Sequence, residues 1–120
     1  MHKQNKYMKI SIITITYNSA KTVQRALDSV QNQHYSDIEH IIVDGASSDG
    51  TREIVEKYAA DHKNVRYISE PDKGIYNALN KGIQMATGDV IGFLHSDDML
   101  YSSDSIGQIA ASFENESVDV

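Results

Sequence analysis

The chain has 120 residues, which is enough for one domain with a sizeable core but not for two. Its 17 acidic and 11 basic residues give a net charge of −6, which argues against binding to nucleic acid or to an anionic membrane, because both need a basic face. It contains no cysteine, which excludes disulfide bonds and thiolate metal sites and fits a reducing cytosol.

Strand and helix patterns alternate along the chain. In chain order we expect strand 9–15, helix 19–33, strand 38–43, helix 51–62, strand 65–69, helix 75–86, strand 90–94 and helix 103–114. Asn18 or Ser19 would cap the first helix, and residues 118–120 are interpreted as the opening of a fifth strand. We expect residues 1–8 to form a disordered leader and residues 9–120 to form one domain.

This alternation predicts an α/β fold with a mostly parallel sheet, because parallel neighbours need crossover connections that place helices on both faces. Right-handed crossovers favour the half-Rossmann strand order 3-2-1-4. In that order the first and fourth strands are neighbours, and the crevice between their carboxyl ends is where open α/β sheets bind ligands.

Polar residues follow three of the expected strands. Thr16, Tyr17 and Asn18 follow the first strand, Asp44 follows the second, and the adjacent acids Asp97 and Asp98 follow the fourth. Paired carboxylates at this edge are suited to a divalent cation that also binds substrate phosphates. The alternative is a solvated loop in which Asp97 or Asp98 caps the next helix, and Asp44 could likewise cap its own loop.

Several other kinds of site are not indicated. No Gly-Lys-Ser/Thr phosphate loop and no Gly-x-Gly-x-x-Gly motif follow the first strands. The five histidines show no paired spacing typical of zinc sites, and no Gly-x-Ser-x-Gly nucleophile motif is present. His95 is notable because it lies two residues before the acidic pair.

Four collinear motifs strongly resemble the family 2 glycosyltransferases, which are GT-A-fold enzymes of bacterial polysaccharide synthesis. The motifs are Ile-Ile-Thr-Ile-Thr-Tyr-Asn at 12–18, Val-Asp-Gly-Ala-Ser-Ser-Asp-Gly-Thr at 43–51, Glu-Pro-Asp-Lys-Gly-Ile-Tyr-Asn-Ala-Leu-Asn-Lys-Gly at 70–82 and Thr-Gly-Asp-Val-Ile-Gly-Phe-Leu-His-Ser-Asp-Asp at 87–98. Each motif is short, but four in the same order cover nearly the whole chain from residue 9.

The resemblance implies a nucleotide-sugar site in a GT-A half. Thr16 and Tyr17 would lie against the base, with Asn18 beside them, and Asp44 would hydrogen-bond the base, typically uracil. Asp97 and Asp98 would form a DXD-like pair, with Asp97 towards the ribose and Asp98 on Mn²⁺ or Mg²⁺. Lys73 is a candidate for a pyrophosphate contact, and its alternative role is that of a solvated loop lysine.

Two features depart from the family pattern. Many members carry an acid where this chain has His95. Family members are also longer, and the half that binds the acceptor and carries the general base lies beyond the position of Val120. We therefore assign no catalytic base here, and we expect a chain truncated at its C-terminal end whose unfinished sheet exposes an edge that could pair into a homodimer.

The first hypothesis is the donor-binding half of an inverting glycosyltransferase. The resemblance implies that it transfers a sugar from a nucleotide-sugar, typically a UDP-sugar, to a glycan or lipid-linked acceptor in cell-surface polysaccharide synthesis. The second is a non-catalytic nucleotide-binding or interaction module. A nucleotidyltransferase is a third, weaker idea, because such enzymes carry a glycine-rich Lys/Arg signature after the first strand, which Thr16-Tyr17-Asn18 lacks. No secretory signal and no run near the ~18 apolar residues of a membrane span is visible, so we expect a cytoplasmic protein, located at the inner face of the membrane if its acceptor is lipid-linked.

Overall fold

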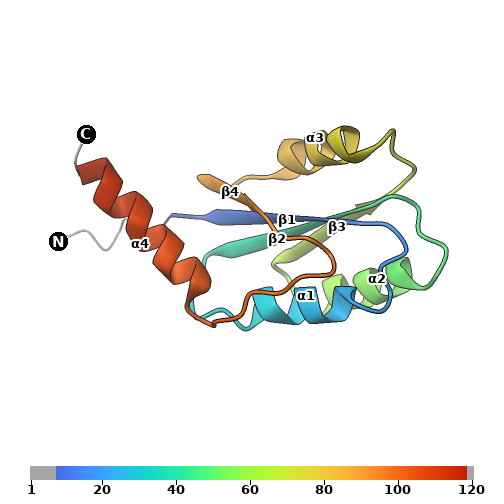
Figure 1. Cartoon of the computed structure of the whole chain (residues 1–120), viewed down its shortest axis with the longest axis horizontal. Helices are drawn as coiled ribbons and strands as arrows, with labels where there is room; N and C mark the ends of the chain where they lie inside the picture. Colours follow the sequence, from blue (N-terminus) through green and yellow to red (C-terminus); the bar gives the residue numbers. More distant parts are fainter. Residues whose placement is uncertain (1–7, 119–120) are drawn as a thin grey trace.

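The computed structural model describes residues 8–118, which form a parallel sheet flanked by helices (Figure 1). The strands are β1 (Ile10–Thr16), β2 (Ile38–Asp44), β3 (Val65–Ser69) and β4 (Val90–Phe93), and the helices are α1 (Val23–Gln31), α2 (Thr51–Asp61), α3 (Ile75–Met85) and α4 (Ser105–Val118). The strand order is β3-β2-β1-β4, and every neighbouring pair is parallel. The predicted α/β class and the order 3-2-1-4 are thus confirmed. The expected leader falls almost entirely on residues 1–7, which lie outside the described residues.

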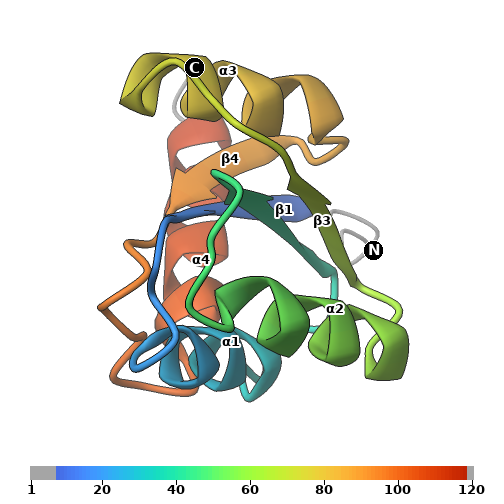
Figure 2. The same cartoon turned by 90° about the vertical axis from the view of Figure 1, so that its right-hand side faces the viewer.

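The helices cover both faces of the sheet. Helices α1 and α2 lie on one face and α3 on the other, while α4 lies beside the amino ends of the strands (Figures 1 and 2). The α4 residues Ile106 and Ala110 pack in one cluster with Ile10 and Ile38, the first residues of β1 and β2. Placing α4 at that end leaves the carboxyl ends of the strands for other loops.

Alternating side chains of the central strands build the core on the two faces. Ile42 of β2 packs against α1 and α2 through Leu27 and Val55, whereas Ile13 of β1 packs with Ala78 of α3. This matches the two-sided burial expected of isoleucine-rich parallel strands. Helix α3 lies very close to β1, since a Cβ at Gly82 would come 2.7 Å from Cγ2 of Ile13.

Two helix boundaries, the start of α1 and the end of α4, differ by four residues from the sequence-based expectation, and the others differ by two residues or fewer. Helix α1 begins at Val23, because Ser19 opens a turn in which its carbonyl accepts the backbone N–H groups of Thr22 (3.0 Å) and Val23 (2.9 Å). Helix α4 continues to Val118, so the expected strand opening at that residue is wrong. No glycine or proline follows Gly107 to end the helix, and residues 119 and 120 lie outside the described part of the chain.

Strand β4 forms an edge of the sheet within residues 8–118. It pairs only with β1 there, and its residues Ile91 and Phe93 are 37% and 57% exposed. Ile83 of α3 is another exposed apolar residue. None of the described helices is long and apolar enough to cross a membrane.

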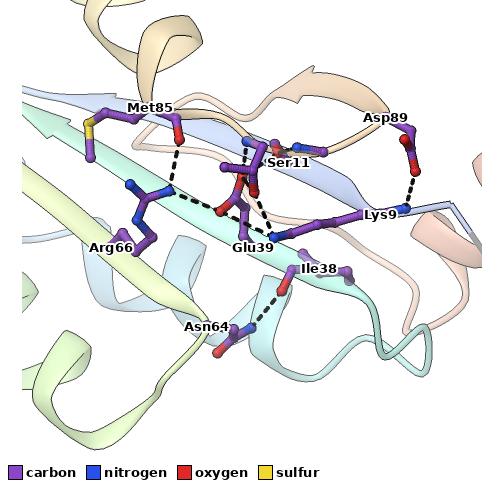
Figure 3. Close-up of polar contacts among 10 residues, drawn as sticks. Lys9, Ser11, Ile38, Glu39, Asn64, Arg66, Met85 and Asp89 are labelled. Carbon is purple, nitrogen blue, oxygen red and sulfur yellow. Dashed lines mark hydrogen bonds and ion pairs between the residues drawn. The ribbon is translucent and has the colours of Figure 1, made fainter.

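A buried carboxylate, Glu39 of β2, connects β1, β3 and the loop between α3 and β4 (Figure 3). Glu39 is 5% exposed and accepts hydrogen bonds from Ser11 Oγ (2.6 Å), the Thr87 backbone N–H (2.6 Å), Thr87 Oγ1 (3.0 Å) and Arg66 Nη1 (3.1 Å). The Lys9 ammonium lies 3.9 Å away. Burial alone would raise the pKa of Glu39, but these hydrogen bonds outweigh it and lower the pKa to about 2.

His40 follows Glu39 in β2, so its side chain lies on the opposite face of the sheet, where it is also buried. It is 1% exposed, its Nε2 lies 2.8 Å from Thr14 Oγ1, and its Nδ1 is buried without a hydrogen-bond partner within residues 8–118. Burial lowers the pKa of His40 to about 3, so the imidazole is neutral at physiological pH.

Candidate functional site

The loops that follow β1, β2 and β3 meet at one end of the sheet. Parallel register places Thr16 of β1 beside Asp44 of β2, and Asp44 beside Ser69 of β3. Figure 2 looks onto this end, which lies on the right in Figure 1. The segment after β4 runs to the same end and forms the turn that carries Asp97 and Asp98. Beside this turn, Ser96 Oγ lies 3.1 Å from Ser19 Oγ. The polar clusters expected at separate strand ends are therefore neighbours in space.

Asp44 lies beneath these loops and holds them together. Its side chain is fully buried. Its Oδ1 accepts from Thr16 Oγ1 and Ser47 Oγ, both at 2.6 Å, and its Oδ2 accepts from the Ser47 backbone N–H (2.9 Å) and Ser69 Oγ (2.8 Å). Burial acts to raise the pKa of Asp44, but these hydrogen bonds keep it below its usual range. Both carboxylate oxygens are therefore occupied by the protein, and a base contact by Asp44 stays a prediction that requires one of these bonds to be replaced.

The segment after β1 is tied to the loop after β2. Asn18 has a positive φ of 49°, a conformation that asparagine tolerates better than most residues. Its backbone N–H donates to Ser47 Oγ (2.8 Å), and its Oδ1 accepts from the Ser48 backbone N–H (3.0 Å). Thr16 is buried with its hydroxyl committed to Asp44, whereas the neighbouring Tyr17 is 67% exposed. The exposed ring of Tyr17 is therefore available to a ligand, while the hydrogen bonds of Thr16 and Asn18 fix the backbone on either side of it.

A pocket with a volume of about 510 Å³ lies between these loops. It brings together three of the predicted site residues, Tyr17, Asn18 and Asp97. We call it the strand-end pocket, and its lining residues are Tyr17, Asn18, Ser19, Lys21, Thr22, Asp49, His95, Ser96 and Asp97. Thr16, Asp44, Lys73 and Asp98 are not among these residues.

The acidic turn after β4 presents its carboxylates to solvent. The Asp97 side chain is 66% exposed, and its Oδ1 lies 2.5 Å from Nδ1 of His95. Arg25 of α1 donates from Nη2 to the Asp97 backbone carbonyl at 3.1 Å. Asp98 is also exposed, and its Oδ1 accepts the Met99 backbone N–H at 2.8 Å. The His95 that departs from the family pattern is thus a direct partner of Asp97.

The donor chemistry of this turn fits a hard divalent cation held in part by the protein. Asp97 and Asp98 offer carboxylate oxygens, the ligands that Mg²⁺ and Mn²⁺ prefer. Within residues 8–118 no group of three or more His, Cys, Asp or Glu side chains is placed to hold a metal ion. Such a cation would therefore need further ligands from a bound molecule, and phosphate oxygens are the usual ones.

Lys73 lies outside the strand-end pocket. Its side chain is exposed, and its backbone N–H donates to Asn77 Oδ1 at 2.9 Å, so its contact with a pyrophosphate stays a prediction. In the same loop, Asp72 extends its carboxylate towards Gly45.

Three residues near the pocket were not singled out from the sequence. They are Asp72, Ser96 and Asp49, of which Asp49 accepts the Ala20 backbone N–H (3.1 Å) and the Thr51 hydroxyl (2.6 Å). The Thr51 hydrogen bond is the main reason that the pKa of Asp49 is lowered. All three lie inside the four motifs that resemble the family, and this position in the motifs is the sequence feature that could have identified them.

Comparison with known proteins identifies relatives over most of the chain. Residues 11–120 match the family described as glycosyl transferase family 2. A PGL/p-HBAD biosynthesis glycosyltransferase of Mycobacterium bovis is 38% identical over 102 residues, which is 84% of this chain and 40% of that protein. The chondroitin synthase of Escherichia coli is 40% identical over 91 residues, or 76% of this chain and 13% of that protein.

Solved structures agree with this match. The crystal structure of S. aureus TarS in complex with UDP-GlcNAc has a TM-score of 0.81 and 30% identity, and the match covers 90% of this chain and 32% of that one. The mannosyltransferase PcManGT from Pyrobaculum calidifontis, in complex with GDP-Man and Mn²⁺, has a TM-score of 0.77 and 29% identity over 82% of this chain and 30% of that one. The chain thus spans less than half the length of each of these relatives.

Proposed function

The chain belongs to glycosyl transferase family 2, and on that premise we propose that it carries the donor-binding part of an inverting glycosyltransferase. The donor is a nucleotide-sugar, a UDP-sugar by preference, and the acceptor is a glycan or lipid-linked sugar in cell-surface polysaccharide synthesis. The observation that carries this proposal is the strand-end pocket, where the exposed Tyr17 ring and the Asp97 carboxylate border one cavity of about 510 Å³. The complexes of the solved relatives with UDP-GlcNAc and GDP-Man support the ligand class.

Each predicted residue has a defined task in this proposal. Tyr17 stacks on the base, since aromatic rings bind bases through their faces. Asn18 shapes the loop beneath the nucleotide, and Asp97 accepts a ribose hydroxyl. Asp98 supplies a carboxylate oxygen to Mn²⁺ or Mg²⁺, and Lys73 approaches the pyrophosphate. When bound, the cation neutralises charge on the diphosphate leaving group.

Buried Asp44 and exposed Arg25 keep this surface in one shape. Asp44 connects the ends of β1 and β3 with Ser47, and Arg25 holds the backbone of the acidic turn from α1. Preorganised contacts of this kind reduce the ordering cost of ligand binding. No residue of the chain is assigned as the general base. We place the protein in the cytoplasm, at the inner face of the membrane where a lipid-linked acceptor is presented.

The proposal is tested by titrating UDP into the chain by calorimetry, with and without Mn²⁺. We expect Mn²⁺ to tighten UDP binding by about tenfold or more, because a carboxylate and a diphosphate repel each other without a cation between them. Asp98→Asn should abolish this enhancement, whereas Asp61→Asn, an exposed change at the end of α2, should preserve it. UDP binding that responds neither to Mn²⁺ nor to Asp98→Asn contradicts the proposal. No response to any nucleotide would support the interaction module instead.

A further inference from the structure

A second pocket, with a volume of about 540 Å³, lies between α1 and the segment that follows the acidic turn. This segment runs along α1 to the start of α4 (Figure 1). None of the residues that we assign to contact the nucleotide or the cation lines this pocket, and Lys21 is the one residue that it shares with the strand-end pocket. We call it the α1 pocket, and the lining residues used below are Lys21, Arg25, Asp28, Asn32, Leu100 and Tyr101.

Hydrogen bonds fix the segment after the acidic turn against α1. The Leu100 backbone N–H donates to Ser29 Oγ at 3.0 Å, and Gln33 Nε2 donates to the Ser102 carbonyl at 2.7 Å. Leu100 also packs against the hydrophobic core. Tyr101 lies between these two anchored positions, yet its side chain is 87% exposed. The α1 pocket is therefore a preformed surface that presents an aromatic ring, and preformed surfaces lose little entropy when they bind a ligand.

The end of the α1 pocket that adjoins the strand-end pocket is cationic. Lys21 lies in the turn before α1 and Arg25 in the first turn of the helix, and both side chains are exposed. Within residues 8–118 neither pairs with a carboxylate, and their one hydrogen bond runs from Arg25 Nη2 to the Asp97 backbone carbonyl. In a chain with a net charge of −6, these two cations can bind an anionic group through charge-assisted hydrogen bonds.

The other end of the pocket offers groups that bind hydroxyls. Asp28 Oδ1 accepts from Gln24 Nε2 (3.2 Å) and from the Tyr58 hydroxyl (3.0 Å). Among the described residues no hydrogen bond reaches Asp28 Oδ2 or the side chain of Asn32. A carboxylate oxygen accepts from a hydroxyl, whereas an amide both donates and accepts. From Arg25 to Asn32 the helix rises about 10 Å, a length that a disaccharide spans.

We propose that the α1 pocket binds a disaccharide segment of an acidic polysaccharide. One sugar ring stacks on Tyr101, Asp28 and Asn32 bind its hydroxyl groups, and Lys21 and Arg25 bind a sugar carboxylate. Aromatic rings provide large apolar contact areas, which suit the apolar face of a sugar, and a planar guanidinium binds a carboxylate through two parallel hydrogen bonds. The inference goes beyond the proposed function by adding a saccharide site outside the strand-end pocket. It rests on that function only for the role of the ligand, which is part of the growing glycan.

NMR titration of the chain with two oligosaccharides of equal length tests this site. Hyaluronan hexasaccharide alternates glucuronate with N-acetylglucosamine, whereas chitohexaose contains N-acetylglucosamine alone. We expect hyaluronan hexasaccharide to shift the amide signals of residues 99–103 and to bind about fivefold more tightly than chitohexaose, because only the former carries carboxylates for the two cations. The preference should shrink in about 0.5 M salt, which screens exposed charges.

Three variants assign the binding to named side chains. Tyr101→Ala should weaken the binding of both oligosaccharides by about three- to tenfold, the contribution of one aromatic contact, and Tyr101→Phe should retain the wild-type affinities. Lys21→Gln should reduce only the preference for hyaluronan hexasaccharide. Tyr76→Ala is the matched control, because Tyr76 is an 80% exposed tyrosine at the start of α3, which lies on the opposite face of the sheet (Figure 2). It should bind both oligosaccharides as the wild type does.

UDP binding in the presence of Mn²⁺ separates this inference from the proposed function, and Tyr101→Ala should leave it unchanged. A chain that binds UDP but neither oligosaccharide overturns the inference alone, as does oligosaccharide binding that Tyr101→Ala does not weaken. Equal affinity for the two oligosaccharides overturns the acidic ligand, and displacement of hyaluronan hexasaccharide by an equal concentration of inorganic phosphate overturns the saccharide site. Binding of hyaluronan hexasaccharide through Tyr101 in a chain that fails to bind UDP supports the inference and contradicts the proposed function.

Discussion

Replacing the buried Glu39 by glutamine should lower the free energy of unfolding of the domain, although Glu39 is not one of the residues that line the strand-end pocket. The carboxylate of Glu39 receives hydrogen bonds from β1, β3 and the loop that leads into β4. A folded-state pKa of about 2 against an ordinary value of 4.5 corresponds to about 3 kcal/mol of stability at neutral pH. That is a large share of the net stability of a domain this size. The side-chain amide of glutamine would also place its N–H groups against the donors that now bind the carboxylate, such as Arg66 and the Thr87 backbone N–H. This repulsion adds to the loss of stability.

The pH dependence gives the sharper result. The folded pKa is lower than the unfolded one, so the stability that Glu39 contributes is present above pH 4.5 and is lost as the pH falls towards 2. Urea unfolding followed by circular dichroism at pH 7, 5, 4 and 3 would measure the difference between the wild type and Glu39→Gln. We expect this difference to be largest at pH 7 and to narrow below pH 4.5.

Glu56→Gln is the matched control for this experiment. Glu56 forms an exposed ion pair with Arg52 one helical turn away (3.0 Å), and such solvent-screened pairs contribute little to stability. A loss below about 1 kcal/mol in Glu39→Gln at pH 7, or a loss that does not change with pH, would refute the reasoning, because either result means that the buried hydrogen bonds do not favour the ionised form.

Two further predictions concern the opposite face of β2 and the edge of the sheet. The folded pKa of His40, about 3, lies below its unfolded value of 6.5, so the wild type should lose between about 2 and 3 kcal/mol as the pH falls from 6.5 to 4.5. In His40→Gln, the free energy of unfolding measured in urea should change less with pH between 6.5 and 4.5, whatever the variant's stability at pH 7. An equal pH dependence in both proteins would contradict a lowered pKa of His40. The exposed edge at β4 should make the chain associate at high concentration, and Phe93→Lys should shift it towards monomer in sedimentation. A wild-type chain that sediments as a clean monomer at high concentration would count against this.

The strands and their order could be predicted because their signals are local and periodic. The isoleucine-rich stretches before Thr16 and Asp44 fit parallel strands buried on both faces, and the crossover rules then leave few orders. The start of α1 was missed because Ser19, a good cap by type, opens a turn that precedes the helix, while its hydroxyl lies beside that of Ser96, 77 residues away. No local pattern reports such a contact.

The clustering of the site at one sheet edge was predictable, but the commitments of its side chains were not. The sequence places Asp44 directly after a strand, yet only the register of three strands reveals that Thr16 and Ser69 reach its oxygens. Likewise, Asp72 and Gly45 are 27 positions apart in the printed sequence, and their contact depends on how the two loops fold back. Hydrogen-bond satisfaction is a property of the packed structure.

The burial of Asp44 has a practical consequence for protein engineering. Because Asp44 connects the loops from below, the exposed residues that we propose to contact a nucleotide can be varied separately from the buried residues that support them. A combinatorial library aimed at a new donor would randomise positions 17 and 97, which line the strand-end pocket, while retaining Asp44 and Ser47. Selectivity should then diverge among variants that share nearly the same melting temperature, whereas libraries that include position 44 should yield mostly insoluble protein.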